Sequence, residues 1–278
     1  MFCMAGHQML AVRSGGKRSR ETALGYYMVA ASIGQGLGPF VVGWLGGAAA
    51  LPPTGLLFAI SLAIAAAGVI VAILIRPVVA KTPHHDPGDF IPIGRLLALR
   101  GFVPVMVSSV VTITALDLLV IYLPALGAER QIDANHIGLL LTVRSLASLV
   151  SRVFYARLIF AAGRMPLTLT SMLCSAAGFV VLALPLPLPV IYAVLICLGF
   201  AMGIASTLTL SGVMYLSPPE VCGTALTLRM TGNRVGQIIF PALAGFLAAA
   251  TGVAGILLAL GIGLAVSGIA VAASRPRS

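Results

Sequence analysis

Charged residues are scarce in this chain of 278 residues, at 9% of the sequence, and only seven residues are acidic. Soluble domains carry about 25% charged residues. Hydrophobic residues make up 59% of the chain, and the mean hydropathy is +1.08. A water-soluble core of this length cannot bury so much apolar surface, so the composition indicates a protein whose solvent is lipid.

The sequence also lacks the patterns of redox, metal and hydrolytic sites. Its four cysteines have neither metal-ligand nor redox spacing, and we interpret them as small apolar residues within helices. His84, His85 and Asp86 lie together and could bind a metal, but a solvated loop is the preferred interpretation. No nucleophile elbow, phosphate loop or pair of catalytic carboxylates occurs, so we expect neither enzyme activity nor a metal.

Long apolar runs are what the sequence does contain. A bilayer core about 30 Å thick needs about 20 helical residues to cross it. Barrel strands would alternate in hydrophobicity over about 10 residues, which these runs do not do. The predicted fold class is therefore all-α, a polytopic membrane bundle. The eight candidate spans are residues 24–46, 55–75, 103–126, 136–157, 167–184, 190–216, 224–250 and 253–273.

The basic residues are unevenly distributed between the two sides of this predicted bundle. If the spans alternate and the loop before residue 24 is cytoplasmic, twelve of the seventeen Lys and Arg residues fall on the cytoplasmic side. Only Arg130 falls outside, and Arg144, Arg152, Arg229 and Arg234 lie within spans. This asymmetry follows the positive-inside rule. It accounts for the net charge of +10, and no basic–aromatic interleaving supports nucleic-acid binding.

An internal repeat relates the two ends of the chain. A shift of 202 residues places 22–43 over 224–245 with eight identities in 22 positions. The spans at 55–75 and 253–273 follow at a similar offset. Parallel repeats of six helices, related by an axis along the membrane normal, are the plan of a large transporter class. The repeat therefore predicts two halves joined by a cytoplasmic linker at 76–101.

The stretch GYYMVAASIGQGLGPFVVG, which begins at Gly25, is rich in residues that weaken helices. It resembles the helix-5 motif of proton-coupled antiporters in the major facilitator superfamily, G-x8-G-x3-G-P-x2-G-G, although Val42 departs from the first of the two final glycines. The chain as a whole resembles helices 5 to 12 of this superfamily, most strongly its efflux members. The matching positions are Gly25, Gly34, Gly38, Pro39 and Gly43.

The resemblance implies how the chain is divided. Residues 1–75 correspond to the tail of helix 4 with helices 5 and 6, and residues 102–278 correspond to helices 7 to 12 with a cytoplasmic tail. Helices 1 to 3 and most of helix 4 have no counterpart. We therefore expect the DNA upstream of Met1 to encode about 100–150 further residues, as a parallel repeat requires.

The resemblance also implies a function, which is secondary active transport. We expect proton-coupled export of a small organic molecule by alternating access, by a monomer in the inner membrane of a bacterium. The proton gradient is the expected energy source, without ATP, metal or bound cofactor. The alternatives are a substrate:proton symporter and a truncated, inactive transporter, with a membrane-embedded enzyme least favoured. Lipid, protons and the substrate are then the expected partners, and nucleic acid is not.

Two interpretations of the glycine motif stay open. Gly34 and Gly38 form a small-x3-small face, which lets two helix backbones approach closely in lipid. Pro39 leaves the carbonyl of Gln35 without its helical partner and allows a kink, as Pro241 does in the second copy. The motif therefore serves either ordinary close packing or a bent interface that seals and reopens during alternating access, and the second copy favours the latter.

The loop between helices 8 and 9 of this superfamily normally carries G-x3-D-R-x-G-R-R. In the corresponding ARLIFAAGRM only Gly163 and Arg164 remain, and Phe160 replaces the aspartate. The usual charge-relay latch is therefore expected to be absent from this loop. Together with Arg152 and Arg229, nearer the cytoplasmic ends of their spans, Gly163 and Arg164 are predicted to gate or brace that side.

Ionisable groups inside spans are costly and tend to face the bundle interior. With Pro124 as the outer end of its helix, Asp117 lies about 10 Å deep, and Arg144 lies about 12 Å deep in the next helix. The two residues are predicted either to form an ion pair or to act in transport. In transport, Asp117 would be the protonatable coupling group, and Arg144 would bias its charge or meet substrate.

Arg234 lies about ten residues into the predicted helix 11, near the midplane where such folds place their sites. Asn233 is its neighbour, and Gln237 follows one turn later. These three residues are predicted to line the transport cavity. Two deep arginines against one acid indicate an anionic or amphipathic substrate.

The charge distribution generates a test of orientation. We expect the segment 13–20 and the tail from Ser274 to face the cytoplasm, because the basic residues gather on that side. Alkaline phosphatase fused at either site should be inactive, and a fluorescent protein fused there should fold and emit. Phosphatase activity at either site would overturn the orientation.

Overall fold

The computed structural model describes residues 22–34, 54–74, 93–218 and 221–274, in which the regular elements are all helices. The chain divides into two compact units, one of Met1–Val29 with Ile91–Ser278 and the other of Ala30–Phe90. In the second unit, α3 runs over Thr54–Leu74, so the run predicted as a span at 55–75 is helical, while its crossing of a membrane stays a prediction. Of the span predicted at 24–46, the described part is helical over 22–34.

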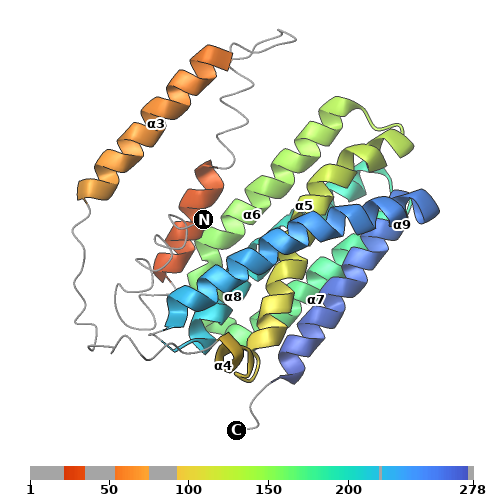
Figure 1. Cartoon of the computed structure of the whole chain (residues 1–278). Helices are drawn as coiled ribbons and strands as arrows, with labels where there is room; N and C mark the ends of the chain where they lie inside the picture. The colour runs from red at the N-terminus through yellow and green to blue at the C-terminus, as the bar shows by residue number, and fades with distance from the viewer. Residues whose placement is uncertain (1–21, 35–53, 75–92, 219–220, 275–278) are drawn as a thin grey trace, which may run out of the picture. The chain divides into compact units, whose positions relative to one another are not determined.

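The first unit contains the helices α5 to α9 labelled in Figure 1. The short α4 precedes them and lies in the linker predicted at 76–101. The all-α prediction is confirmed, since each span predicted from residue 103 onward coincides with a helix that extends it by at most a few residues. The elements are α4 (Ile93–Leu97), α5 (Phe102–Glu129), α6 (Ala134–Ala162), α7 (Arg164–Ala183), α8 (Leu188–Leu216) and α9 (Cys222–Ala273).

Element α9 is two helices joined at Gly252. This residue has φ 69° and ψ −173°, a conformation that is essentially restricted to glycine. Each of the two helices is long enough to cross a bilayer, and α5 to α9 are all apolar enough to do so. The five elements therefore supply six crossings, as predicted from the apolar runs at 224–250 and 253–273.

The side chains of the last residue of α5 and of the residue after it form hydrogen bonds that join three helices. We call this end of the bundle the Arg130 end. Glu129 Oε1 accepts a hydrogen bond from the backbone N–H of Val253, at 3.4 Å, where the second helix of α9 begins. Arg130 Nη2 donates to the carbonyl of Leu182 in the last turn of α7, at 2.9 Å. Burial lowers the pKa of the Arg130 guanidinium, and the Glu129 carboxylate opposes that shift.

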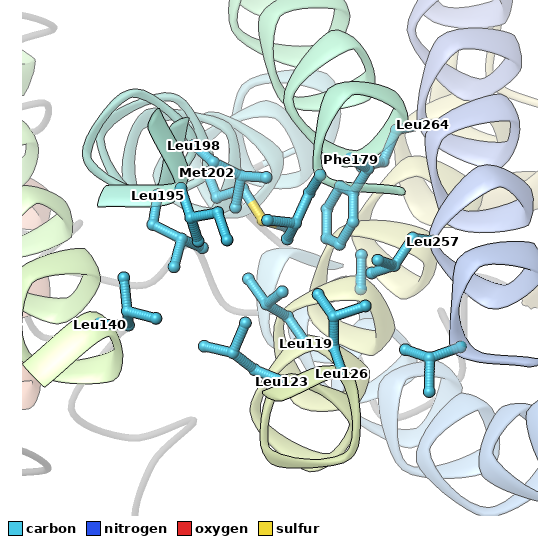
Figure 2. Close-up of a cluster of buried hydrophobic side chains, with 14 of the residues drawn as sticks. Leu119, Leu123, Leu126, Leu140, Phe179, Leu195, Leu198, Met202, Leu257 and Leu264 are labelled. Carbon is cyan, nitrogen blue, oxygen red and sulfur yellow. The ribbon is translucent and has the colours of Figure 1, made fainter. Parts of the chain in front are cut away.

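The largest apolar core lies toward the Arg130 end, between α5, α7, α8 and the second helix of α9. Figure 2 shows its side chains converging from these helices, with Leu140 from α6 at one side. In lipid this packing contributes through dispersion and shape rather than through removal of apolar surface from water. The labelled members are Leu119, Leu123, Leu126, Leu140, Phe179, Leu195, Leu198, Met202, Leu257 and Leu264.

Glycines determine which helices pack in pairs. The most extensive pairings are α6 with α8, α5 with α9 and α7 with α9. A methyl group added at Gly236 of α9 would lie 2.6 Å from Cγ1 of Val110 in α5. One added at Gly199 of α8 would overlap the backbone carbonyl of Arg144 in α6. Such contacts are closer than any larger residue allows, so these two seams depend on glycine.

Two prolines inside helices do not end them. The sequence prediction that Pro124 marks the outer end of its helix is wrong, because α5 continues through Pro124 to Glu129. Neighbouring helices and local adjustments make proline tolerable within membrane helices. Asp117 therefore lies twelve residues, or about 18 Å, from the end of α5. In α9 the dihedral angles stay helical through Pro241, and the break comes at Gly252.

The α5–α9 seam generates a matched pair of substitutions. Gly236→Ala should destabilise the protein by about 1–3 kcal/mol, because the new methyl group overlaps Val110. Gly232→Ala, one turn earlier, places its methyl group 3.5 Å from Val110, an ordinary contact. It should be neutral or stabilising by up to about 1 kcal/mol through helix propensity. Thermal unfolding in detergent measures both, and equal effects of the two changes would contradict the seam.

Candidate functional site

Asp117, near the middle of α5, is connected to α9 by a chain of two hydrogen bonds. Its Oδ2 accepts a bond from Nε2 of Gln237 at 2.6 Å. The Oε1 atom of Gln237 accepts a bond from Nη1 of Arg234 at 2.7 Å. A neutral amide thus stands between a carboxylate and a guanidinium, with each end of the amide facing the charge that suits it. We call these three residues the amide bridge.

The local fold explains why the amide bridge forms. Arg234 and Gln237 are three residues apart and so lie on the same side of α9. Gly236 brings that helix close to α5, which places Gln237 within reach of Asp117. A second hydrogen bond crosses the same seam, from Oγ of Ser109 to Oδ1 of Asn233 at 3.2 Å. Asn233, Arg234 and Gln237, which were predicted to act together near the midplane, thus lie together at the α5–α9 seam. Their role stays a prediction.

The alternative that Asp117 and Arg144 form an ion pair is wrong for the residues that the structure describes. No nitrogen of Arg144 pairs with the carboxylate, which instead accepts from Gln237. The physical reason is that α5 packs mainly on α9 and α6 mainly on α8, although α5 and α6 are consecutive.

Arg144 and Arg152 both contact serines. Nη2 of Arg152 donates to Oγ of Ser206 in α8 at 3.3 Å. Nη2 of Arg144 donates to Oγ of Ser145 at 3.4 Å, and its Nε is buried without a hydrogen-bond partner among the described residues. The backbone of Arg144 is held against Gly199, so the position of this guanidinium is set by the α6–α8 seam.

At the opposite end of the bundle, α6 passes into α7 through Gly163, whose φ of 80° favours glycine. We call this the Gly163 end. Arg164 begins α7 there, and its Nη1 donates to Oγ of Ser211 in α8. Its guanidinium also lies 4.9 Å from the centre of the Tyr215 ring. The hydroxyl of the buried Tyr155 shares a hydrogen bond with the same Ser211 oxygen, at 2.7 Å. Arg164 therefore joins α7 to α8, which is the geometry of a brace.

The remaining predicted residues divide between described and undescribed parts of the chain. Arg229 is 6% exposed and lies in the first turns of α9. Gly25 is buried against α6, where an added methyl group would lie 3.7 Å from the carbonyl of Arg152 and from the Tyr155 ring. An added methyl group at Gly34 meets nothing within 4 Å. The other members of the glycine motif, Gly38, Pro39 and Gly43, lie outside the described residues.

Several polar contacts were not anticipated from the sequence. Oγ atoms of serines and ring systems of tyrosines supply most of the partners of the arginines, and such residues are common in membrane helices. The usable signal was the spacing of Gly199 and Gly203 in a charge-free run, since small residues four apart predict a close helix partner. The partners of the arginines are Ser145, Ser206, Ser211 and Tyr215, while Ser109 bonds to Asn233 and Tyr155 bonds to Ser211.

No group of three or more His, Cys, Asp or Glu side chains among the described residues is placed to hold a metal ion. A cavity of about 160 Å³ between α5 and α9 is lined by apolar side chains together with Thr114. What the described residues do provide is an acid, several arginines and hydroxyl groups inside helices long enough to span a membrane.

Residues 105–278 match the family model described as Major Facilitator Superfamily. The match covers α6 to α9 completely and nearly all of α5, so it includes both the amide bridge and the Arg164 contacts. No curated protein matches the chain.

The contacts of Arg164 generate a stability test. Arg164→Ala removes a cation–π contact and a charge-assisted hydrogen bond, so it should destabilise the protein by about 1–3 kcal/mol. Arg157→Ala is the matched control, since Arg157 is exposed on α6 and its ring contact with Phe154 is longer, at 5.9 Å. It should change stability by less than about 0.5 kcal/mol. Equal losses in thermal unfolding would show that Arg164 braces nothing.

Proposed function

Because the chain belongs to the major facilitator superfamily, we propose that it is a proton-coupled exporter of a small organic molecule, with Asp117 as its proton-binding group. Membership of this family makes it an integral membrane transporter and points to transport rather than catalysis. We assign the helices α5, α6, α7 and α8 and the two parts of α9, in order, to the six helices of one half of such a transporter, and their number and order support this assignment.

The proposed role of Asp117 rests on one observation, which is its depth within α5 together with its hydrogen-bond partner. Asp117 lies about 18 Å from the end of α5. An ionised side chain is costly at such a depth in the membrane, and the acids found there generally have a function. The hydrogen-bond donor to Asp117 is the neutral Gln237 rather than a directly paired cation. A carboxylate in direct contact with arginine is strongly held in its charged form. Asp117 lacks that constraint and is suited to gain and lose a proton.

Arg144 is proposed to meet the substrate. Its side chain is half-buried, while its backbone is fixed against Gly199. A substrate oxygen would accept a hydrogen bond from the guanidinium, and the fixed backbone would favour one orientation of the bound molecule.

The direction of transport rests on the glycine motif at residues 25–43, which resembles that of proton-coupled antiporters. We propose that the substrate leaves the cell as a proton enters, across the inner membrane of a bacterium, with both ends of the intact protein in the cytoplasm. Everted vesicles with an acidic interior separate this from symport. Adding substrate outside should release protons from the vesicles if the protein is an antiporter and should not do so if it is a symporter.

Asp117→Asn tests the proton-binding role. Asparagine keeps an oxygen that accepts the bond from Gln237 but cannot take up a proton at neutral pH, so the protein should fold with Tm within about 4 °C of the wild type. Transport driven by a pH gradient should fall to the level of empty proteoliposomes, while downhill movement of substrate survives. A panel of organic acids, bases and neutral compounds supplies the substrate.

The matched control is Asp133→Asn, which removes the same charge from an exposed position just before α6. It should leave both activities unchanged. Full gradient-driven transport by the Asp117→Asn protein would rule out the coupling role. Loss of folding in that variant, recovered by adding Arg144→Gln, would instead show that the two charges serve stability alone.

A further inference from the structure

We propose that Gln237 is a positioning residue that transmits the protonation of Asp117 to Arg234, so that proton binding loosens the contact between α5 and α9. This inference deepens the proposed function and rests on Asp117 being its proton-binding group. It assigns a role to the amide itself, which neither binds a proton nor carries a charge.

The ionised state of Asp117 fits the amide in one orientation only. A carboxylate accepts hydrogen bonds and cannot donate them, so the amide nitrogen must face it, at the observed 2.6 Å. A guanidinium donates and cannot accept, so the amide oxygen must face Arg234, at the observed 2.7 Å. Both bonds involve a charged partner, and such bonds are roughly twice as strong as neutral ones. The bridge is therefore strongest when Asp117 is ionised.

Protonation weakens the bridge whichever oxygen of Asp117 takes the proton. If the proton goes to Oδ2, its O–H meets the N–H₂ group of Gln237, and two donors face each other. Turning the amide over relieves that conflict but places the same N–H₂ group against the donors of Arg234. If the proton goes to the other oxygen, both bonds persist geometrically, but the bond to Gln237 loses its charge assistance. In every case Arg234 loses its indirect attraction to a negative charge.

The position of the bridge turns this chemical change into a structural one. Asp117 is on α5 and the other two residues are on α9, so the bridge is a contact between helices. Among the described residues, two other side-chain hydrogen bonds join α5 to α9. One joins Ser109 to Asn233 and involves no titrating group, and the other joins the carboxylate of Glu129 to the backbone N–H of Val253 at the Arg130 end. Arg234 is exposed, so its guanidinium is free to turn away once the amide releases it.

The test measures whether Asp117 and Arg234 are coupled, and whether Gln237 carries the coupling. Tm is measured in detergent for the full chain, for Asp117→Asn, for Arg234→Gln and for both changes together. At neutral pH the double variant should lose less Tm than the two single variants combined, because Asp117→Asn removes the charge at one end of the bridge and Arg234→Gln removes the charge at the other. In a Gln237→Met background, which keeps the length of the side chain and removes the amide, the two losses should add.

The pH dependence distinguishes a relay from a merely structural contact. On acidification the coupling between residues 117 and 234 should shrink toward zero in the protein that retains Gln237, because Asp117 becomes protonated. The Asn233→Leu background is the matched control. It removes the hydrogen bond between Ser109 and Asn233 and should leave both the coupling and its pH dependence in place. If Gln237→Met does not fold, Gln237→Asn serves instead, because its shorter side chain cannot reach both partners.

Two results would overturn the relay: coupling that persists in the Gln237→Met background, or coupling that does not change on acidification. Failure of the proposed function is separable from either, because it is read in transport. If Asp117→Asn abolishes gradient-driven transport but residues 117 and 234 are uncoupled, Asp117 binds the proton and Gln237 transmits nothing. If the coupling is present while Asp117→Asn transports normally, the bridge exists but does not serve proton-driven transport.

Discussion

The close approach of helix backbones at glycine is the constraint on which the rest of this bundle depends. Lipid supplies no hydrophobic force between apolar helices, so contact area and small residues decide which helices pair. Here Gly236 pairs α9 with α5, and Gly199 with Gly203 pairs α8 with α6. Any residue with a side chain at these positions would meet Val110, Arg144 or Ser151. The apolar core of Figure 2 fills the space between these pairs toward the Arg130 end.

The polar contacts follow from that pairing. With α9 against α5, Gln237 reaches Asp117, and with α8 against α6, Ser206 reaches Arg152. Each of these groups is expensive in a membrane unless it has a partner. The glycine seams thus give costly polar side chains a partner on the neighbouring helix.

Much of the fold could be predicted from the sequence because crossing a membrane needs about 20 apolar residues, a demand that is visible locally. The long runs from residue 103 onward, and the separation of the two helices at Gly252, were recovered in this way. The hydrogen-bond partner of Asp117 was not recovered, because Arg144 is closer in the sequence and at a similar depth. The choice between Arg144 and Gln237 depends on which helices pack together. The end of α5 was misplaced for a different reason, since proline ends helices in water more strictly than in lipid. The contacts of Arg164 with Ser211 and Tyr215 carry no local signal, so only the packed structure reveals them.

The central claim is that Asp117 takes up a proton in the middle of the membrane. Infrared difference spectroscopy of the reconstituted protein, recorded between neutral and acidic pH, observes a protonated carboxyl group directly through its C=O stretching band. We expect a band in the wild-type protein that is absent from Asp117→Asn and displaced in Gln237→Met, since the amide of Gln237 is bonded to this carboxyl group. Identical difference spectra of the wild-type and Asp117→Asn proteins would contradict the claim.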